Sequence, residues 1–165
     1  MVITMDSYPN DSSLPAKFNF EIRNCRDNDL IGIEEIEKSS FDDPYPLSLF
    51  RRFLKEFPKG FRVAVSNGEI IGYCILIPSE VGTDSFLLAS IAVDARLRAR
   101  GIGTKLVEDG FSICRASGAR SITLQVRVNN DIAISLYSKL GFRDEGVIQG
   151  YYGIGKDALE MKINL

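Results

Sequence analysis

An apolar segment that runs directly into a turn rich in arginine and glycine is the feature that most limits how this chain can fold. Residues 90–93, Ser-Ile-Ala-Val, precede Arg98-x-x-Gly101-x-Gly103, and a helix-forming segment follows at once. The two glycines carry no Cβ atoms, so an anion can approach the backbone, and a helix that starts here offers unpaired N–H groups and the positive end of its dipole. The pattern predicts a strand, a phosphate-binding turn and a helix, in that order.

Two better-known phosphate loops do not fit this turn. A dinucleotide-binding fingerprint needs a third glycine where Leu106 stands, and a P-loop needs Gly-Lys-Ser/Thr, which the chain lacks. The remaining pattern is also compatible with an ordinary connection between a strand and a helix. The flanking sequence therefore has to decide between a phosphate site and a plain turn.

Composition excludes several classes of function. A chain of 165 residues fits one domain with its own core. Its net charge of −2 argues against bulk nucleic-acid binding, so any anion site is local. The absence of histidine excludes a His-based triad and a His-liganded metal, and we predict no metal site. Three widely spaced cysteines, an odd number, favour reduced core thiols over a disulfide framework: Cys25, Cys74 and Cys114.

The ends and the hydropathy of the chain suggest where it works. No apolar run approaches the roughly 18 residues that a membrane span needs, and the N-terminus lacks a signal-peptide pattern. We therefore expect a cytoplasmic protein with no membrane contact. Residues 1–17 are rich in Asp, Ser, Asn and Pro, which predicts a flexible leader before a single domain at 18–165.

Hydrophobic periodicity predicts alternating elements in the first half of the chain. Residues 18–23 alternate as a strand, and Leu30, Ile33 and Ile36 share one helical face. A second helix follows the turn cluster at 42–46. Asn67-Gly68 supplies the positive φ angles of a type I′ hairpin turn, and residues 86–93 form the next strand.

The second half continues the alternation. A helix after Gly103 ends near Gly118 and buries one face, Leu106, Val107, Phe111 and Cys114. Residues 122–128 form a strand with one apolar and one polar face, a helix runs from Asn130 or Asp131 to Gly141, and two strands occupy 143–165. The resulting order, β-α-α-β-β-β-α-β-α-β-β, indicates an α/β (α+β) fold in which helices flank one mixed, mostly antiparallel sheet.

Three sequence blocks extend the phosphate turn into a family resemblance. They are residues 90–103, residues 124–142 with Leu-Gln-Val-Arg, Asn130, Ala133, Leu136-Tyr137 and Leu140-Gly141-Phe142, and Tyr151-Tyr152 with Asp157-Ala158-x-x-Met161. Over roughly residues 20–165 the chain resembles the GNAT superfamily of N-acetyltransferases, in its RimI and Ard1 branch. The resemblance implies the GNAT fold, acetyl-CoA as the cofactor, and a protein N-terminus as the acceptor.

The resemblance also implies which residues hold acetyl-CoA. The pyrophosphate would bind the N–H groups that follow Arg98, on Ala99, Arg100, Gly101, Ile102, Gly103 and Thr104. The backbone of Ile91, Ala92 and Val93 would bind the pantetheine arm and the thioester oxygen, because the next strand parts from theirs in this family; their side chains alone read as strand core. Asn130 would both cap its helix and contact the pantetheine.

The catalytic residues are implied with two alternatives left open. Tyr137 matches the family's general acid, although a tyrosine there could also be a core residue with a satisfied hydroxyl. RimI enzymes place a glutamate base where this chain has Gln125, which accepts no proton at neutral pH. Asp43 matches an acidic residue in the loop between the first two helices of Ard1-like enzymes, but an Asp-Pro turn explains it equally well.

The acceptor is expected to meet Tyr45, Tyr151 and Tyr152, which resemble the aromatic walls of this branch or else are half-buried loop tyrosines. An α-amine of pKa about 8 is roughly 10% neutral at pH 7, and a lysine only about 0.04%. The missing glutamate therefore favours an N-terminal α-amine over a lysine. The resemblance implies an acceptor of the ribosomal-protein or nascent-chain type. We expect direct attack in a ternary complex, because no cysteine falls in a matched block. A GNAT enzyme acting on lysine or a small amine, and a non-catalytic acyl-CoA-binding module, remain the alternatives.

Overall fold

One mixed β-sheet organises the part of the chain that the structure describes. The computed structural model describes residues 18–79 and 84–165, so the predicted leader at 1–17 lies outside the described residues. The strands are β1 (Glu21–Asn24), β2 (Phe61–Ser66), β3 (Glu69–Pro78), β4 (Ser85–Val93), β5 (Ser121–Arg127), β6 (Arg143–Ile148) and β7 (Ala158–Asn164). The α-helices are α1 (Leu30–Ser40), α2 (Leu47–Glu56), α3 (Ile102–Ala116) and α4 (Asp131–Lys139). The predicted order of elements is confirmed.

The strands lie in the order β1-β2-β3-β4-β5-β7-β6. Every neighbouring pair is antiparallel except β4 and β5, which are parallel, so the mixed, mostly antiparallel sheet is confirmed. The first strand begins at Glu21 rather than at residue 18, because only Glu21 to Asn24 have partners on β2. The hairpin between β2 and β3 turns at Asn67 and Gly68, whose φ angles are 50° and 80° as the type I′ prediction requires.

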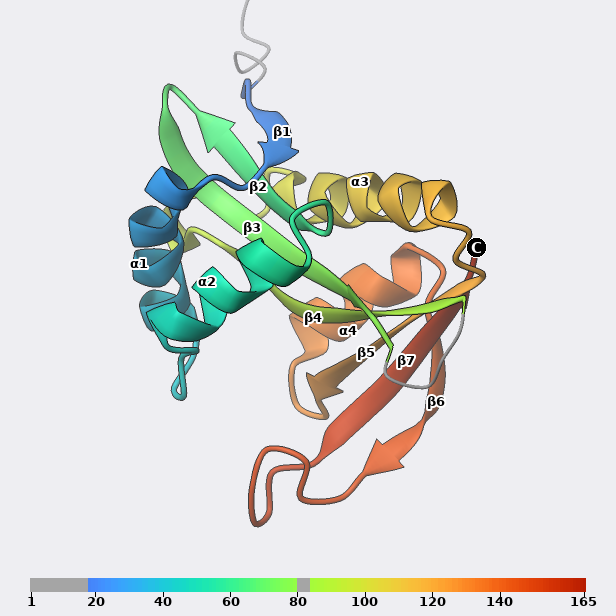
Figure 1. Ribbon diagram of the computed structural model, residues 1–165. Helices are drawn as coiled ribbons and strands as arrows, with labels where there is room; N and C mark the ends of the chain where they lie inside the picture. The colour runs from blue at the N-terminus through green and yellow to red at the C-terminus, as the bar shows by residue number, and fades with distance from the viewer. Residues whose placement is uncertain (1–17, 80–83) are drawn as a thin grey trace, which may run out of the picture.

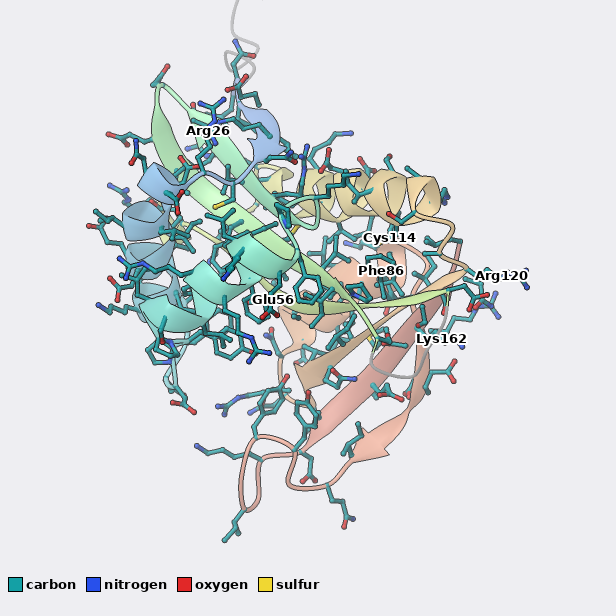
Figure 2. All side chains as sticks on the ribbon, in the orientation of Figure 1. Arg26, Glu56, Phe86, Cys114, Arg120 and Lys162 are labelled. Atoms are coloured by element: carbon teal, nitrogen blue, oxygen red, sulfur yellow. The ribbon has the colours of Figure 1, made fainter. Side chains whose placement is uncertain are left out.

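Helices cover both faces of the sheet, in two pairs (Figure 1). α1 and α2 cover one face over β2 to β4, with a buried cluster around Ile33, Phe50 and Tyr73. α3 and α4 cover the other face, with a larger cluster that includes Leu106, Leu124 and Met161. Cys114 of α3 belongs to this larger cluster, and Phe86 of β4 packs against it (Figure 2). The predicted buried face of α3 is confirmed.

β4 and β5 are paired along only part of their length. Their register runs from Ser85 opposite Ser121 to Leu87 opposite Thr123 and then stops, although β4 continues to Val93. Nearby, β4 also shifts register against β3, since Ile75 pairs with Ser90 but Leu76 pairs with Leu88. Backbone groups of β4 beyond Leu87 therefore face a gap in the sheet, and the implied parting of these strands is confirmed.

Candidate active site

The glycine turn stands at the end of β4, at the mouth of this gap. Gly101 caps α3 in the left-handed region, with φ of 78°, and a Cβ added there would meet no heavy atom within 4 Å. Ala99 also has a positive φ, 60°. The first helical hydrogen bond of α3 runs from the Lys105 amide to the Gly101 carbonyl, 3.0 Å away, so the preceding amides have no partner within the helix. The turn thus presents backbone donors on an open surface.

Basic side chains surround the turn, but they are not equivalent. Arg96 pairs with Asp94 at 2.6 Å and Lys105 with Glu108 at 2.7 Å. Arg100 lies over the Phe18 ring, 5.0 Å from its centre, and forms no ion pair with a described residue.

Arg98 ties the turn to neighbouring elements. Its Nε donates to the Val93 carbonyl at 3.3 Å, and an Nη donates to the Ser40 hydroxyl of α1 at 3.4 Å. The guanidinium therefore holds the end of β4, while the amides of the turn remain accessible. This contact also occupies one of the Val93 backbone groups that the sequence had assigned to the cofactor.

Tyr137 lies on α4 and is only 6% exposed. Its ring packs edge-on against Phe142, with 5.7 Å between ring centres. Burial raises the pKa of Tyr137 above its ordinary value, and the neighbouring Tyr152 and Cys74 side chains raise it further. Because no described residue hydrogen-bonds to its hydroxyl, the phenol is a protonated group whose donor capacity is unused.

The helix that carries Tyr137 starts as predicted. The Asn130 side chain accepts a hydrogen bond from the Ala133 amide at 3.2 Å and caps α4. Ala133 and Leu136 of this helix are half-buried. A Cβ placed on Gly103 would lie 3.5 Å from the Leu136 side chain, so the start of α3 approaches the middle of α4 closely.

Three tyrosines gather at the end of the sheet where the β6–β7 connection turns back. Tyr151 and Tyr152 stack edge to face, with ring centres 4.9 Å apart. The Tyr152 hydroxyl donates to the Gln125 carbonyl at 2.9 Å. Burial raises the pKa of Tyr152 to about 12, with further contributions from Tyr151 and Tyr45, while Arg127 lowers it.

Tyr45 reaches this group from the α1–α2 loop. It is 36% exposed, and burial, then Tyr151, then Glu37 raise the pKa of its hydroxyl. Two segments more than 100 residues apart therefore present aromatic rings to one space. The structure brings the three predicted tyrosines together, and Tyr152 also neighbours Tyr137.

Asp43 is exposed in the same loop and makes no hydrogen bond to a described residue. Its neighbour Asp42 lies 4.0 Å from Arg127 of β5, which places the loop beside the polar face of β5. The structure therefore puts Asp43 near the tyrosines but gives its carboxylate no fixed direction.

Sequence reasoning missed a buried carboxylate on α1. Glu37 is 2% exposed and accepts hydrogen bonds from the Tyr45 amide at 2.8 Å and from the Tyr73 hydroxyl. The Tyr73 hydroxyl also lies 3.0 Å from the Ser90 hydroxyl of β4. The signal was present in the sequence, since Glu37 stands four residues after Ile33, on the apolar face of the helix.

A second carboxylate, Glu160 of β7, was also missed. Glu160 is the direct partner of Gln125 across the β5–β7 ladder, and the Gln125 amide donates to it at 2.9 Å. A single glutamate in the last strand carries no motif, so only the register of the two strands reveals it.

Several features of the structure suit a CoA thioester. Separately, the described residues include no cluster of groups suited to a metal ion. Free amides at the start of α3 suit a pyrophosphate, and unpaired backbone of β4 suits an extended arm. A Cβ-free surface at Gly101 leaves room for the anion.

The thiols of Cys25 and Cys114 are kept protonated by burial, which raises the pKa of each to about 12. None of the helices among the described residues is long and apolar enough to cross a membrane.

Among the described residues, the sheet parts between its one pair of parallel neighbours, with a glycine turn and a helix at the opening, and this arrangement fits the N-acetyltransferase class. The family model of the acetyltransferase (GNAT) family matches residues 30–142. The chain belongs to the GNAT family.

Individual relatives refine this assignment. The chain is 35% identical to an N-α-acetyltransferase of Sulfurisphaera tokodaii, over 86% of this chain and 91% of that protein. It is 32% identical to the N-α-acetyltransferase RimI of Mycobacterium tuberculosis, over 78% and 82% of the two chains. The solved structure of Ard1 from Thermoplasma volcanium superimposes with a TM-score of 0.83 at 27% identity, over 88% of this chain and 97% of that one. The resemblance to the RimI and Ard1 branch is confirmed, and the protein is an acyltransferase of that branch, a family that uses acyl-CoA donors.

Proposed function

We propose that this protein transfers acetyl from acetyl-CoA to the N-terminal α-amine of a protein, by direct attack within a ternary complex. The observation that carries the proposal is the convergence of Tyr45, Tyr151 and Tyr152 beside β5, next to the gap in the sheet at whose end the donor turn around Gly101 begins. Such a gap lets the flexible end of a peptide reach the thioester of acetyl-CoA from the side opposite the pantetheine arm. Relatives named as N-α-acetyltransferases support the same acceptor.

On the donor side, the amides from Ala99 to Thr104 hold the pyrophosphate, and Asn130 contacts the arm while it caps α4. Acetyl-CoA, when bound, supplies a thioester whose carbonyl carbon receives the amine. Ile91, Ala92 and Val93 lie in the part of β4 beyond its pairing with β5, and their free backbone groups bind the arm and the carbonyl oxygen. Hydrogen bonds aimed at such an oxygen are worth several kcal/mol in acyl transfer.

Tyr137 acts as the acid for the departing sulfur. The N–C bond forms, the C–S bond breaks, and the sulfur takes the phenolic proton. Burial keeps that proton on Tyr137 at neutral pH, so the acid is in its working state before the substrates arrive.

The proton lost by the amine needs an acceptor, and the sequence suggests Asp43. Its exposure lets it act through water from the α1–α2 loop, beside the acceptor tyrosines. If Asp43 is this acceptor, Asp43→Asn lowers kcat at pH 7 about tenfold or more, since general bases contribute roughly 10²-fold or more to such steps. A kcat unchanged within about threefold from pH 6 to 9 would remove Asp43 from the mechanism.

The acceptor class is tested with a peptide panel. Peptides with free N-termini, including ribosomal-protein and nascent-chain sequences, are incubated with acetyl-CoA beside matched peptides whose N-terminus is blocked and whose lysine is free. We expect labelling of the free N-termini and none of the blocked set. Labelling confined to lysine or to small amines contradicts the proposal, and cofactor binding without any labelling identifies a non-catalytic module. The proposed setting is the cytoplasm, where nascent chains and ribosomal proteins are made.

A further inference from the structure

Glu160 and Gln125 form a fixed pair on the polar face of the β5–β7 ladder. Gln125 Nε2 donates to Glu160 Oε2 at 2.9 Å, and Gln125 Oε1 accepts from the Tyr151 hydroxyl at 3.2 Å. An amide has a donor end and an acceptor end, and here each end meets the matching partner. Gln125 therefore orients the Glu160 carboxylate and connects it to the acceptor tyrosines.

The Glu160 carboxylate can still accept a further hydrogen bond. Glu160 is half-buried, forms no ion pair with a described residue, and its Oε1 accepts no hydrogen bond from one. A carboxylate oxygen that accepts no hydrogen bond from the protein can accept one from a ligand, so Oε1 is available to an approaching amine.

The groups around Glu160 leave this capacity open. Lys162, labelled in Figure 2, lies two residues further along the same face of β7 and forms no ion pair with a described residue. Arg127, two residues along β5, is directed over Tyr152, 5.4 Å from the ring centre, and toward Asp42. On β6 the opposing residue is Gly146, which has no side chain. The hydroxyls of Tyr151 and Tyr152 complete the surroundings.

We propose that Glu160, held by Gln125, is the group that takes the proton of the acceptor amine; this inference rests on the proposed acetyl transfer. Glu160 takes one proton from the charged amine and later releases it to solvent. The neutral nitrogen bonds to the carbonyl carbon and loses a second proton to solvent, while the C–S bond breaks and the sulfur leaves with the proton of Tyr137. Tyr137 regains a proton from solvent, so the balance is one proton released for each charged amine consumed. Asp43, in contrast, has no hydrogen bond that directs it to this space.

The effect of Glu160 depends on pH in a way that a structural role does not. At pH 7 an α-amine is roughly 90% protonated, and at pH 9 roughly 10%, so a proton acceptor matters most at the lower pH. Glu160→Gln removes the charge but keeps the shape, and its amide oxygen can still accept the bond from Gln125. The fold is therefore preserved while the proton acceptor is lost.

The experiment compares kcat and KM for an N-terminal peptide from pH 6 to 9.5 in four proteins. These are the wild type, Glu160→Gln, the exchange variant Gln125→Glu/Glu160→Gln, and the control Glu21→Gln on the exposed edge strand β1. We expect Glu160→Gln to lose about tenfold or more in kcat at pH 7 and about threefold or less at pH 9. The exchange variant restores a carboxylate to the same pair and should recover most of the loss.

Several results would overturn the inference. One is a Glu160→Gln enzyme whose kcat stays within about threefold of wild type at every pH. Another is a loss of equal size at pH 7 and pH 9 that the exchange variant fails to recover. If the wild type labels only lysine, the proposed acceptor fails but Glu160 is still tested, because its deficit on a lysine acceptor should then persist to higher pH.

Discussion

The Glu37 carboxylate accepts a hydrogen bond from the backbone amide of Tyr45, 2.8 Å away, and so connects the buried face of α1 to the α1–α2 loop. The same carboxylate accepts from the Tyr73 hydroxyl, which lies 3.0 Å from Ser90 of β4. A continuous set of polar contacts therefore runs from Tyr45, which is proposed to contact the acceptor peptide, to β4, which is proposed to bind acetyl-CoA.

Loss of the Glu37 carboxylate should weaken the attachment of Tyr45, one of the three tyrosines proposed to contact the acceptor peptide. Hydrogen bonds to charged groups contribute about 1.5 kcal/mol or more, so Glu37→Gln should raise KM for the peptide about tenfold while acetyl-CoA binding changes little. Steady-state kinetics with each substrate varied in turn measures this split. Glu35→Gln, on the exposed side of the same helix, is the control. An unchanged peptide KM would show that Tyr45 is held by other contacts.

Removing the Tyr137 hydroxyl should slow the chemical step alone. Tyr137→Phe keeps the packing against Phe142, so the melting temperature and CoA affinity should stay near wild type. The kcat should fall about 10²-fold, the usual contribution of a general acid. Release of free CoA thiol measures kcat, and calorimetry measures CoA binding. A kcat within about threefold of wild type would reduce Tyr137 to a packing residue.

The raised pKa of Tyr137 predicts the alkaline side of the pH profile. Burial favours the neutral phenol, so ionisation occurs above the ordinary value of about 10, and the acid form persists throughout the working range. In the wild type, kcat should therefore show no descending limb below pH 10. The measurement is kcat at saturating substrates across pH 6 to 10. A decline with an apparent pKa near 8 would mean that a different group supplies the proton.

A methyl group on the glycine turn should separate backbone strain from cofactor binding. Gly101 and Gly68 have φ angles of 78° and 80°, and a Cβ at either position meets nothing within 4 Å. Alanine should therefore cost each site about 1 kcal/mol of stability. Only Gly101→Ala should also weaken CoA binding, by about tenfold, because its methyl group faces the proposed pyrophosphate. Equal CoA affinity in the two variants would place the pyrophosphate elsewhere.

An ion pair beside β1 should make stability depend on acid. Asp29 accepts from Arg23 at 2.7 and 2.9 Å and from the Arg26 amide at 2.7 Å. Burial opposes its charge, but these bonds prevail and lower the pKa of Asp29. A lowered pKa contributes stability above the unfolded value of about 3.9, and that stability is lost as pH falls through the folded value.

Asp29→Asn should therefore destabilise the protein by about 2 kcal/mol at pH 7, and by less near pH 3. Urea unfolding at both pH values measures the difference. Asp27→Asn, which removes an exposed charge in the same short turn, should change stability by less than about 0.5 kcal/mol. Equal losses at both pH values would mean that Asp29 contributes through packing rather than charge.

The sequence was sufficient for the elements because each carries its own local signal. Asn67-Gly68 specifies a turn, Asn130 specifies a cap, and the spacing of Leu106, Phe111 and Cys114 specifies a buried helical face. Motif blocks likewise located the glycine turn and Tyr137.

Pairwise placement could not be read in the same way. Nothing local indicates that Glu160 stands opposite Gln125, because strand register depends on the whole sheet. The burial of Glu37 beneath Tyr45 likewise requires the packing of α1 against β3 and β4. The contact of Arg98 with Val93 and Ser40 was hidden for the same reason, since three distant segments meet there.

The parted strands also have a mechanical consequence. β4 and β5 share only three paired positions, so the four strands on one side and the three on the other are joined along this line by a short seam. The pantetheine arm of acetyl-CoA, lying along β4, would take the place of further strand pairing and stabilise the contact between the two parts of the sheet. Backbone amides on both sides of the seam should then exchange with deuterium more slowly when the donor is bound, and the enzyme should gain rigidity from its own substrate.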